Sequence, residues 1–220
     1  MLLTRWRAAG DVAGTEVDGG RKRSAAVGSP TGLRAHQLER RERIIRAAIE
    51  LLEVREYDKV QIRDVAEQAN TALATVYRYF ASKEQLYAAA AVQWSAHFFE
   101  RIEVTGDDGA TDEERLRKIL LRTVRALQRW PQFIRALMIL NTSSDENVRA
   151  YLNEYHSHYN DMVAMCLHDL TPGTAADVLM VIGSVYDRAT RDWALGRRSV
   201  GEVERELDRA IDLVFEPLPD

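Results

Sequence analysis

The chain has 220 residues, of which 46% are hydrophobic and 29% are charged, with a net charge of −4. This length and composition exclude a disordered chain and allow one large domain or two small ones with a buried core. The sequence contains no run of 18 apolar residues, lacks the apolar core of a secretory signal and has one cysteine, Cys166, so we expect a cytoplasmic protein without an internal disulfide.

The charge is unevenly distributed along the chain. Residues 1–83 hold 15 Lys and Arg against 11 Asp and Glu, whereas residues 84–220 hold 15 against 23. A basic N-terminal part on an acidic body indicates that one end of the molecule meets a polyanion. Residues 1–35 are rich in Gly, Ser, Thr and Ala without periodicity and are expected to form a disordered basic arm, which either contacts DNA or is simply solvated.

Three helical segments follow the arm. Apolar residues at helical spacing predict a helix over 36–54 and a second one of barely two turns over 62–69. Asn70 and Thr71 predict a tight turn, because Asn tolerates the left-handed conformation. In a third helix over about 72–79, Val76 and Phe80 lie one turn apart and can face the core, while Tyr77 lies on a different side.

Two short helices joined by a turn and braced by a longer helix describe a helix-turn-helix. The Tyr77 hydroxyl could then reach a phosphate, and Thr75 and Arg78 could present donors outward. Lys83 would open the next helix, where its ammonium and the free amides around Ser82 form a natural phosphate site. Residues 36–83 are therefore predicted to be a DNA-binding domain.

The remainder of the chain also has a helical pattern. Gly106–Gly109, Pro131 and Pro172-Gly173 mark the main breaks, and no strand alternation is evident. The chain is predicted to be all-α, with about nine helices. Four capping boxes predict helix starts: Ser82 with Gln85, Thr111 with Glu114, Ser143 with Glu146, and Ser199 with Glu202.

The stretch YDKVQIRDVAEQANTALATVYRYFASKEQLYAAA, residues 57–90, resembles the DNA-binding signature of TetR/AcrR-type transcriptional regulators. The resemblance covers about 41–90 and implies a homodimer with a three-helix DNA-binding head and a larger helical body that binds a small ligand. It assigns residues 84–220 to ligand binding and dimerisation. Together with the pattern above, it gives the expected DNA-binding residues: Arg41, Arg63, Thr71, Ala72, Leu73, Thr75, Tyr77, Arg78 and Lys83.

The sequence departs from the family pattern at three places. Gln61 stands where a Thr or Ser usually opens the second helix, and it is a poorer cap. The turn lacks the usual Ser cap of the recognition helix, so Thr71 is expected to cap it one residue early. Ala74 stands where Gly is common and adds a methyl group close to the DNA backbone. These departures leave the operator sequence open.

Bulky apolar side chains in residues 84–180 suit the walls of a site for an apolar ligand with few polar groups, although such stripes are usually plain core. The stripe over 144–169 keeps helical spacing for five turns. The expected ligand-binding residues are Trp94, Phe98, Leu127, Trp130, Phe133, Leu137, Met138, Tyr151, Tyr155, Tyr159, Met162 and Met180.

Two apolar helices are predicted to close the chain, over 174–196 and 199–215. A two-fold axis would make a four-helix interface of them, which is also what the resemblance implies, with Gly183 and Ser184 allowing close approach. The alternative is that both helices merely complete a monomer core. The expected interface residues are Ile182, Val185, Tyr186, Ala189, Trp193, Val203, Leu207, Ile211 and Val214.

No P-loop, Gly-rich fingerprint, H-E-x-x-H motif or Cys pair is present, so no enzyme activity, cofactor or metal is predicted. We expect a ligand-responsive regulator, and more specifically a repressor, that binds an inverted-repeat DNA operator and is released by a small, largely apolar effector. Residues 125–133 and 192–215 are faintly similar to actinobacterial regulators of sterol breakdown, which favours an acyl- or sterol-coenzyme A thioester as effector. The alternative is a small-molecule binding or sensing module without a DNA role.

Overall fold

The computed structural model describes residues 35–100 and 111–216. The predicted basic arm lies outside these residues except for Ala35. The described part of the chain folds into nine α-helices and one short 3-10 turn and contains no strand, as the all-α prediction requires. The elements are α1 Ala35–Val54, η1 Tyr57–Lys59, α2 Ile62–Gln68, α3 Leu73–Tyr79, α4 Lys83–Glu100, α5 Asp112–Leu127, α6 Pro131–Leu140, α7 Glu146–Ala164, α8 Pro172–Ala194 and α9 Val200–Phe215.

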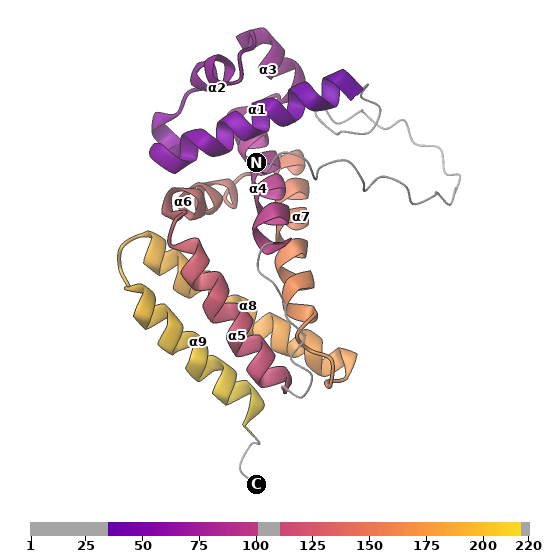
Figure 1. The fold of residues 1–220 in the computed structure, drawn as a ribbon, viewed down its shortest axis with the longest axis vertical. Helices are drawn as coiled ribbons and strands as arrows, with labels where there is room; N and C mark the ends of the chain where they lie inside the picture. The colour runs from indigo at the N-terminus through magenta and orange to yellow at the C-terminus, as the bar shows by residue number, and fades with distance from the viewer. Residues whose placement is uncertain (1–34, 101–110, 217–220) are drawn as a thin grey trace, which may run out of the picture.

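Helices α1, α2 and α3 form a head at one end of the molecule (Figure 1). Val76 and Phe80 are almost fully buried there, as predicted from their spacing, and Tyr79 joins them because it lies on the same face. Asn70 has a φ of 49°, and the Thr71 amide donates to the Ala66 carbonyl at 2.9 Å, which confirms the tight turn between α2 and α3.

The observed caps explain where several helices begin. Thr111 with Glu114, and Ser199 with Glu202, form the complete capping boxes that the sequence predicts. The prediction for Thr71 is wrong, because Ala72 is the N-cap of α3 and its methyl group accepts no hydrogen bond. The prediction for Ser143 is also wrong: α7 is capped by Asp145, whose carboxylate accepts from the Asn147 amide at 2.8 Å.

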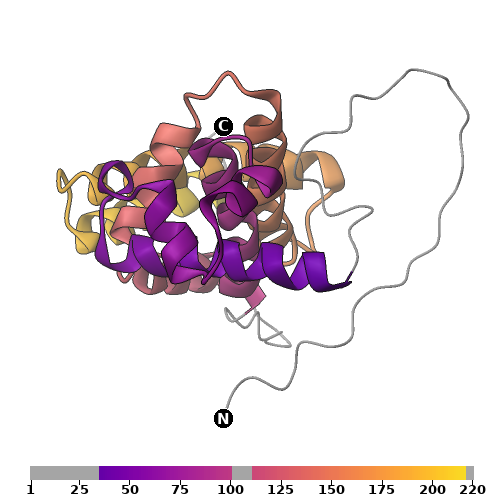
Figure 2. The same ribbon diagram turned by 90° about the horizontal axis from the view of Figure 1, so that it is seen from above.

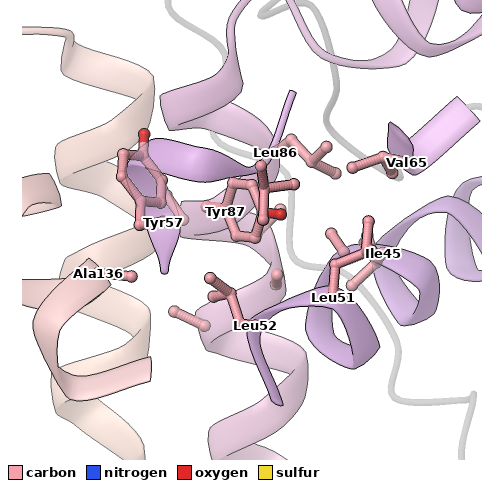
Figure 3. Packing of buried hydrophobic residues seen from close by; sticks show 14 of the residues in the cluster. Ile45, Leu51, Leu52, Tyr57, Val65, Leu86, Tyr87 and Ala136 are labelled. Carbon is pink, nitrogen blue, oxygen red and sulfur yellow. The ribbon is translucent and has the colours of Figure 1, made fainter. Parts of the chain in front are cut away.

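One continuous apolar core joins the head to the body. Tyr57 of η1 and Tyr87 of α4 meet edge to face, with ring centroids 5.2 Å apart, and Leu52 and Ala136 belong to the same cluster (Figure 3). Helix α4 leaves the head and packs along α7, while α6 lies beneath α1 (Figures 1 and 2). The head therefore rests directly on helices of the body.

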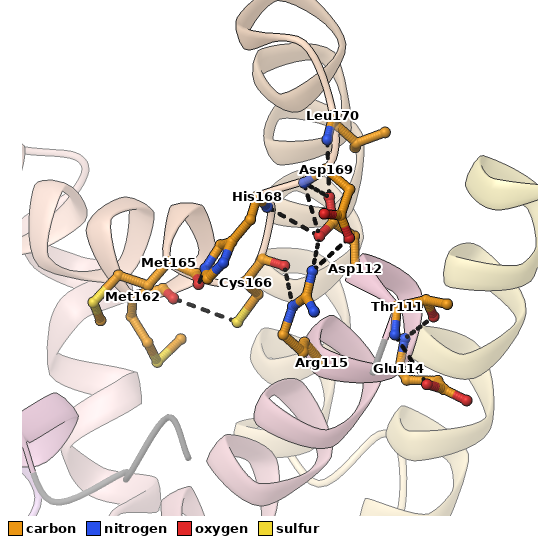
Figure 4. Close-up of polar contacts among 10 residues, drawn as sticks. All are labelled: Thr111, Asp112, Glu114, Arg115, Met162, Met165, Cys166, His168, Asp169 and Leu170. Carbon is orange, nitrogen blue, oxygen red and sulfur yellow. Dashed lines mark hydrogen bonds and ion pairs between the residues drawn. The ribbon is translucent and has the colours of Figure 1, made fainter. Parts of the chain in front are cut away.

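A second core is built from α5, α7, α8 and α9. At the start of α5, the buried carboxylate of Asp112 holds the connection between α7 and α8. The Asp112 carboxylate accepts hydrogen bonds from the backbone amides of His168, Asp169 and Leu170 at 2.9 to 3.2 Å (Figure 4). Arg115 pairs with the same carboxylate and donates to the Cys166 carbonyl at 3.1 Å. These bonds attach the connection between α7 and α8 to the start of α5.

Candidate nucleic-acid interface and ligand cavity

Helix α3 presents a mixed polar and apolar surface outward. Leu73, Tyr77 and Arg78 are exposed, and 49% of Tyr77 is accessible. Ala72 at the N-cap is exposed too, while Thr71 and Thr75 are half-buried. The same short helix thus buries one face in the head and leaves the other available, which is the geometry that insertion into a major groove requires.

Two of the predicted DNA-binding cations, Arg63 and Lys83, lie in different surroundings. Arg63 is exposed, with its Nε 3.9 Å from a carboxylate oxygen of Asp64. Lys83 lies over the ring of Tyr57, with Nζ 4.1 Å from the centroid, and donates to the Tyr57 carbonyl. Burial lowers the pKa of Lys83, although nearby carboxylates oppose the shift. Its ammonium would have to leave this position to reach a phosphate.

Arg41 is buried, which requires its expected role at DNA to be revised. Only 9% of the residue is exposed, its guanidinium lies 5.2 Å from the centroid of the Phe80 ring, and it donates to the Tyr151 hydroxyl at 3.1 Å. The reason is that Arg41 lies on the face of α1 that packs toward the body. A helical pattern alone does not tell which side of α1 a second domain covers.

A cavity of about 750 Å³ lies between α6, α7 and α8. Its volume is in the range typical of small-molecule sites. Among the expected ligand-binding residues, five line it: Leu137, Met138, Tyr155, Tyr159 and Met180. Its wall also contains residues that were not among the predicted ligand-binding residues: Ile134, Asn141, Thr142, His156, Asn160, Asp187, Thr190 and Arg191, together with Gly183, Ser184 and Tyr186, which were expected at a subunit interface.

The remaining expected ligand-binding residues do not line this cavity. Trp94 packs against Phe98, Trp130 and Phe133, with ring centroids 4.2 to 5.6 Å apart, in the core shared by head and body. Leu127 is buried in that core, Met162 is buried in the second core, and Tyr151 accepts from Arg41. These large apolar side chains therefore pack in the core, which was the alternative to ligand binding for an apolar stripe at helical spacing.

The buried part of the cavity wall is mostly apolar and aromatic, whereas most of the polar lining residues are exposed. Tyr159 stacks on Tyr186, with ring centroids 4.7 Å apart. Burial raises the pKa of both phenols well above the usual range, so they stay protonated and can donate hydrogen bonds. Among the exposed lining residues, Arg191 pairs with Asp187, and burial lowers the pKa of His156, which the carboxylate of Asp187 partly opposes.

The assignment of α8 and α9 residues to a subunit interface also has to be revised. Five of the expected residues are buried within the single chain, in cores with α5: Ile182, Ala189, Val203, Leu207 and Ile211. Val185, Tyr186, Trp193 and Val214 are half-buried against the same cores. The inward stripes of α8 and α9 cover each other and α5. Large apolar side chains exposed on these elements are Met180, Val181, Leu195 and Leu213.

A helix-turn-helix head on a helical body with a cavity of small-molecule size is typical of a class of DNA-binding regulators. Residues 44–90 match the family model "Bacterial regulatory proteins, tetR family", and residues 109–214 match "Tetracyclin repressor-like, C-terminal domain". The chain is 32% identical to the HTH-type transcriptional repressor KstR of Rhodococcus jostii (strain RHA1), over 81% of this chain and 84% of the relative. The chain therefore belongs to the TetR family of bacterial transcriptional regulators, which are not enzymes.

Solved structures share the fold. A TetR transcriptional regulator from Rhodococcus sp. RHA1 superposes with a TM-score of 0.69 at 23% identity, covering 84% of this chain and 100% of that one. The regulator FadR from Bacillus subtilis, in complex with stearoyl-CoA, superposes with a TM-score of 0.59 at 20% identity, covering 79% of this chain and 96% of that one. Over the described residues, no helix has the length and apolar character needed to cross a membrane.

Proposed function

We propose that the protein is a cytoplasmic, ligand-responsive repressor that binds operator DNA as a homodimer and leaves it when an apolar effector occupies the cavity between α6, α7 and α8. The observation that supports DNA binding is that α3 has one buried face and one exposed face. Val76 and Tyr79 hold the helix in the head, while Leu73 and Tyr77 are exposed on its other face. A helix held in this way has side chains free for base edges and phosphates.

The DNA contacts follow from the exposed positions of α3. Ala72 and Leu73 at its start would contact base edges, and the Tyr77 hydroxyl would donate to a phosphate. Because a two-fold dimer presents two such helices, the operator should be an inverted repeat with half-site centres about 34–36 Å apart or a multiple of this. Arg63 and Arg78 are exposed and available for further phosphate contacts.

The dimer would form through the outer surface of α8 and α9. Leu213 is 71% exposed, and Val181, which is 42% exposed, adds to the apolar surface. Exposed Arg205 and Glu202 supply charges of both signs on α9. A surface with both apolar and oppositely charged groups can be complementary to itself under a two-fold axis. The proposed interface is therefore made by exposed residues of α8 and α9, and not by their buried inward stripes.

A coenzyme A thioester of an apolar acyl or sterol group is the proposed effector. The buried part of the cavity wall suits the apolar part of such a molecule, and the exposed polar residues Asn141, Asn160 and Arg191 suit groups that remain in water. The FadR structure with stearoyl-CoA supports the same class of effector, as an analogy from a protein of the same fold.

Fluorescence anisotropy with labelled DNA from upstream of the protein's own gene tests the function. We expect saturable binding that withstands an excess of scrambled DNA and weakens as salt rises. Stearoyl-CoA, used as probe, should release the DNA, while coenzyme A alone should not. Equal binding to native and scrambled fragments would favour the alternative, a small-molecule binding module without a DNA role.

A further inference from the structure

Gln85, in the first turn of α4, is a buried polar residue that joins two distant parts of the chain. It is 4% exposed, and its side-chain oxygen accepts from the Ala81 amide, just beyond the end of α3, at 3.1 Å. Its side-chain nitrogen donates at 2.9 Å to the carboxylate of Asp145, the N-cap of α7. Because both ends of the amide are used, one side chain connects the end of α3 to the start of α7.

The carboxylate of Asp145 has a separate oxygen for each of its two tasks. One oxygen accepts from the Asn147 amide at 2.8 Å and caps α7, while the other accepts from Gln85. The bond from Gln85 lowers the pKa of Asp145, and the bonds from the capped amides add to this effect against the opposing influence of burial. The carboxylate therefore stays ionised at neutral pH, and its bond with Gln85 is charge-assisted.

Arg41 makes a second connection between the same two elements. Its guanidinium donates to the hydroxyl of Tyr151, in the second turn of α7, at 3.1 Å, and it lies 5.2 Å from the centroid of the Phe80 ring. Phe80 is the C-cap of α3 and is almost fully buried. The two connections thus run from the first two turns of α7 to two consecutive residues at the end of α3, Phe80 and Ala81.

The following turns of α7 line the cavity. Tyr155, His156, Tyr159 and Asn160 are part of its wall, and α7 packs along α4 below the head (Figure 1). A helix is a rigid element, so a displacement of its cavity-lining turns also displaces its first turns. A molecule that shifts α7 would therefore move the groups to which Gln85 and Arg41 are bonded.

We propose that Gln85 and Arg41 are positioning residues for operator binding. They hold the end of α3 in an orientation that α7 sets, and a ligand that shifts α7 releases it, although neither residue has to touch DNA. Only contacts that differ between the two arrangements contribute to such coupling, and these two bonds are the contacts that would differ. The inference rests on the proposed roles of α3 and the cavity, and it names the bonds through which one controls the other.

An exchange of donor and acceptor between Gln85 and Asp145 tests the first connection. Gln85→Glu keeps an oxygen for the Ala81 amide but places a carboxylate against that of Asp145. Asp145→Asn keeps an oxygen for the cap of α7 but places an amide against that of Gln85. Each single variant should bind the labelled upstream DNA about tenfold more weakly, because a hydrogen bond to a charged group is lost. The double variant again has a donor opposite an acceptor and should regain most of the native affinity.

Fluorescence anisotropy at pH 8 measures the four affinities. If the native protein binds the DNA and both single variants bind it equally tightly, the inference is wrong while the proposed function stands. A double variant no tighter than the weaker single variant would also overturn the inference, because the losses would not come from this bond. If the native protein itself does not bind, the proposed function fails and the inference fails with it.

Asp112→Asn separates positioning from a general loss of stability. Asp112 accepts several buried hydrogen bonds at the end of α5 that points away from the head (Figures 1 and 4). This variant should be less stable than the native protein but should bind DNA with native affinity at a temperature well below its melting point. If Asp112→Asn weakens DNA binding as much as Gln85→Glu does, destabilisation explains both results and the inference is overturned.

Gly183→Val tests the connection to the cavity without a ligand. A Cβ atom on Gly183 of α8 would lie 3.8 Å from Cε1 of Tyr159 on α7, so Gly183→Ala makes an ordinary contact, whereas Val adds two more carbons beside the ring. Gly183→Val should therefore press on α7 and weaken DNA binding, and Gly183→Ala should not. An unchanged affinity for Gly183→Val would overturn the role of α7.

The same substitution should lose its effect once both connections are broken. In a chain that already carries Gln85→Glu and Tyr151→Phe, adding Gly183→Val should change the DNA affinity little, because α7 no longer holds the end of α3. Interaction between substitutions at separate sites is the measure of their coupling. A loss of the same size in both backgrounds would show that α7 acts on DNA binding by another route, and it would overturn the assignment to Gln85 and Arg41.

Discussion

The guanidinium of Arg41 donates to the hydroxyl of Tyr151 at 3.1 Å and thereby connects α1 of the head to α7. A second polar link to α7 comes from α4, where the Gln85 side-chain amide donates to the carboxylate of Asp145, the N-cap of α7, at 2.9 Å. The later turns of α7 carry Tyr155 and Tyr159, which line the cavity. One helix therefore contacts both the DNA-binding head and the cavity.

Replacing Tyr151 tests what the bond to Arg41 contributes. Tyr151→Phe keeps the ring but removes the acceptor of a buried charged donor, so we expect the free energy of unfolding to fall by about 1–2 kcal/mol. Chemical denaturation measures this difference. Tyr77→Phe removes a hydroxyl from an exposed ring and is the control, which should leave the unfolding free energy nearly unchanged. A Tyr151→Phe variant as stable as that control would contradict the prediction.

Substitutions at Tyr77 and Phe80 should have separate effects, one on DNA binding and the other on stability. Tyr77→Phe should weaken operator binding by roughly ten- to a hundredfold, because a hydrogen bond to a charged phosphate is lost. The loss should be similar on specific and scrambled DNA, since phosphate contacts carry little sequence information. Phe80→Ala should instead lower the unfolding free energy by about 3–5 kcal/mol, because the ring is almost fully buried. Binding isotherms and thermal melts of both variants check this division, and an early melt of Tyr77→Phe with normal DNA binding would reverse it.

Asp112 makes stability depend on acid pH. Burial tends to raise its pKa, but the bonds from Arg115 and from the amides of His168, Asp169 and Leu170 outweigh burial and lower the pKa below its usual value. A depressed pKa stabilises the folded state above the pKa of the unfolded carboxyl, about 3.9, and this contribution is lost as pH falls through the lower folded value.

The variant Asp112→Asn should therefore be less stable at neutral pH by about 2–3 kcal/mol, because an acceptor of several buried donors loses its charge. The difference between the native protein and this variant should shrink as pH falls below about 4. Urea denaturation across the acid range measures it. Asp169→Asn is the control: its side chain is 71% exposed, so a small effect is expected. A pH-independent difference would show that the Asp112 charge contributes nothing.

Leu213 and Ile211 lie two residues apart on α9, and replacing them should have different effects: one on dimerisation and the other on stability. Leu213→Arg places a charge on the exposed surface, so we expect a monomer with nearly unchanged unfolding free energy. Ile211→Ala leaves a void in the core between α5 and α9 and should lower the unfolding free energy by about 2–4 kcal/mol. Light scattering after size-exclusion chromatography gives the mass of each variant. A Leu213→Arg variant that remains dimeric would place the subunit interface elsewhere.

The helices and the DNA-binding head could be predicted from the sequence because their signals are local. Helical spacing placed Val76 and Phe80 in the core, and the boxes of Thr111 with Glu114 and Ser199 with Glu202 marked helix starts. These features depend on residues a few positions apart, which interact within one turn of a helix. The resemblance over residues 41–90 then supplied the family.

The cavity and the outer surface of α8 and α9 could be recognised only in the tertiary structure. An apolar stripe shows that a helix face is covered, but not by which element, so Trp94 and Met162 were expected at a ligand and are packed in the cores. For the same reason Ile211, expected at a partner chain, contacts α5 of its own chain, and Arg41 bonds to Tyr151, which lies 110 residues further on. The sequence by itself determined which faces are apolar and where the helices begin, whereas packing between distant helices decided which of those faces became core, cavity or free surface.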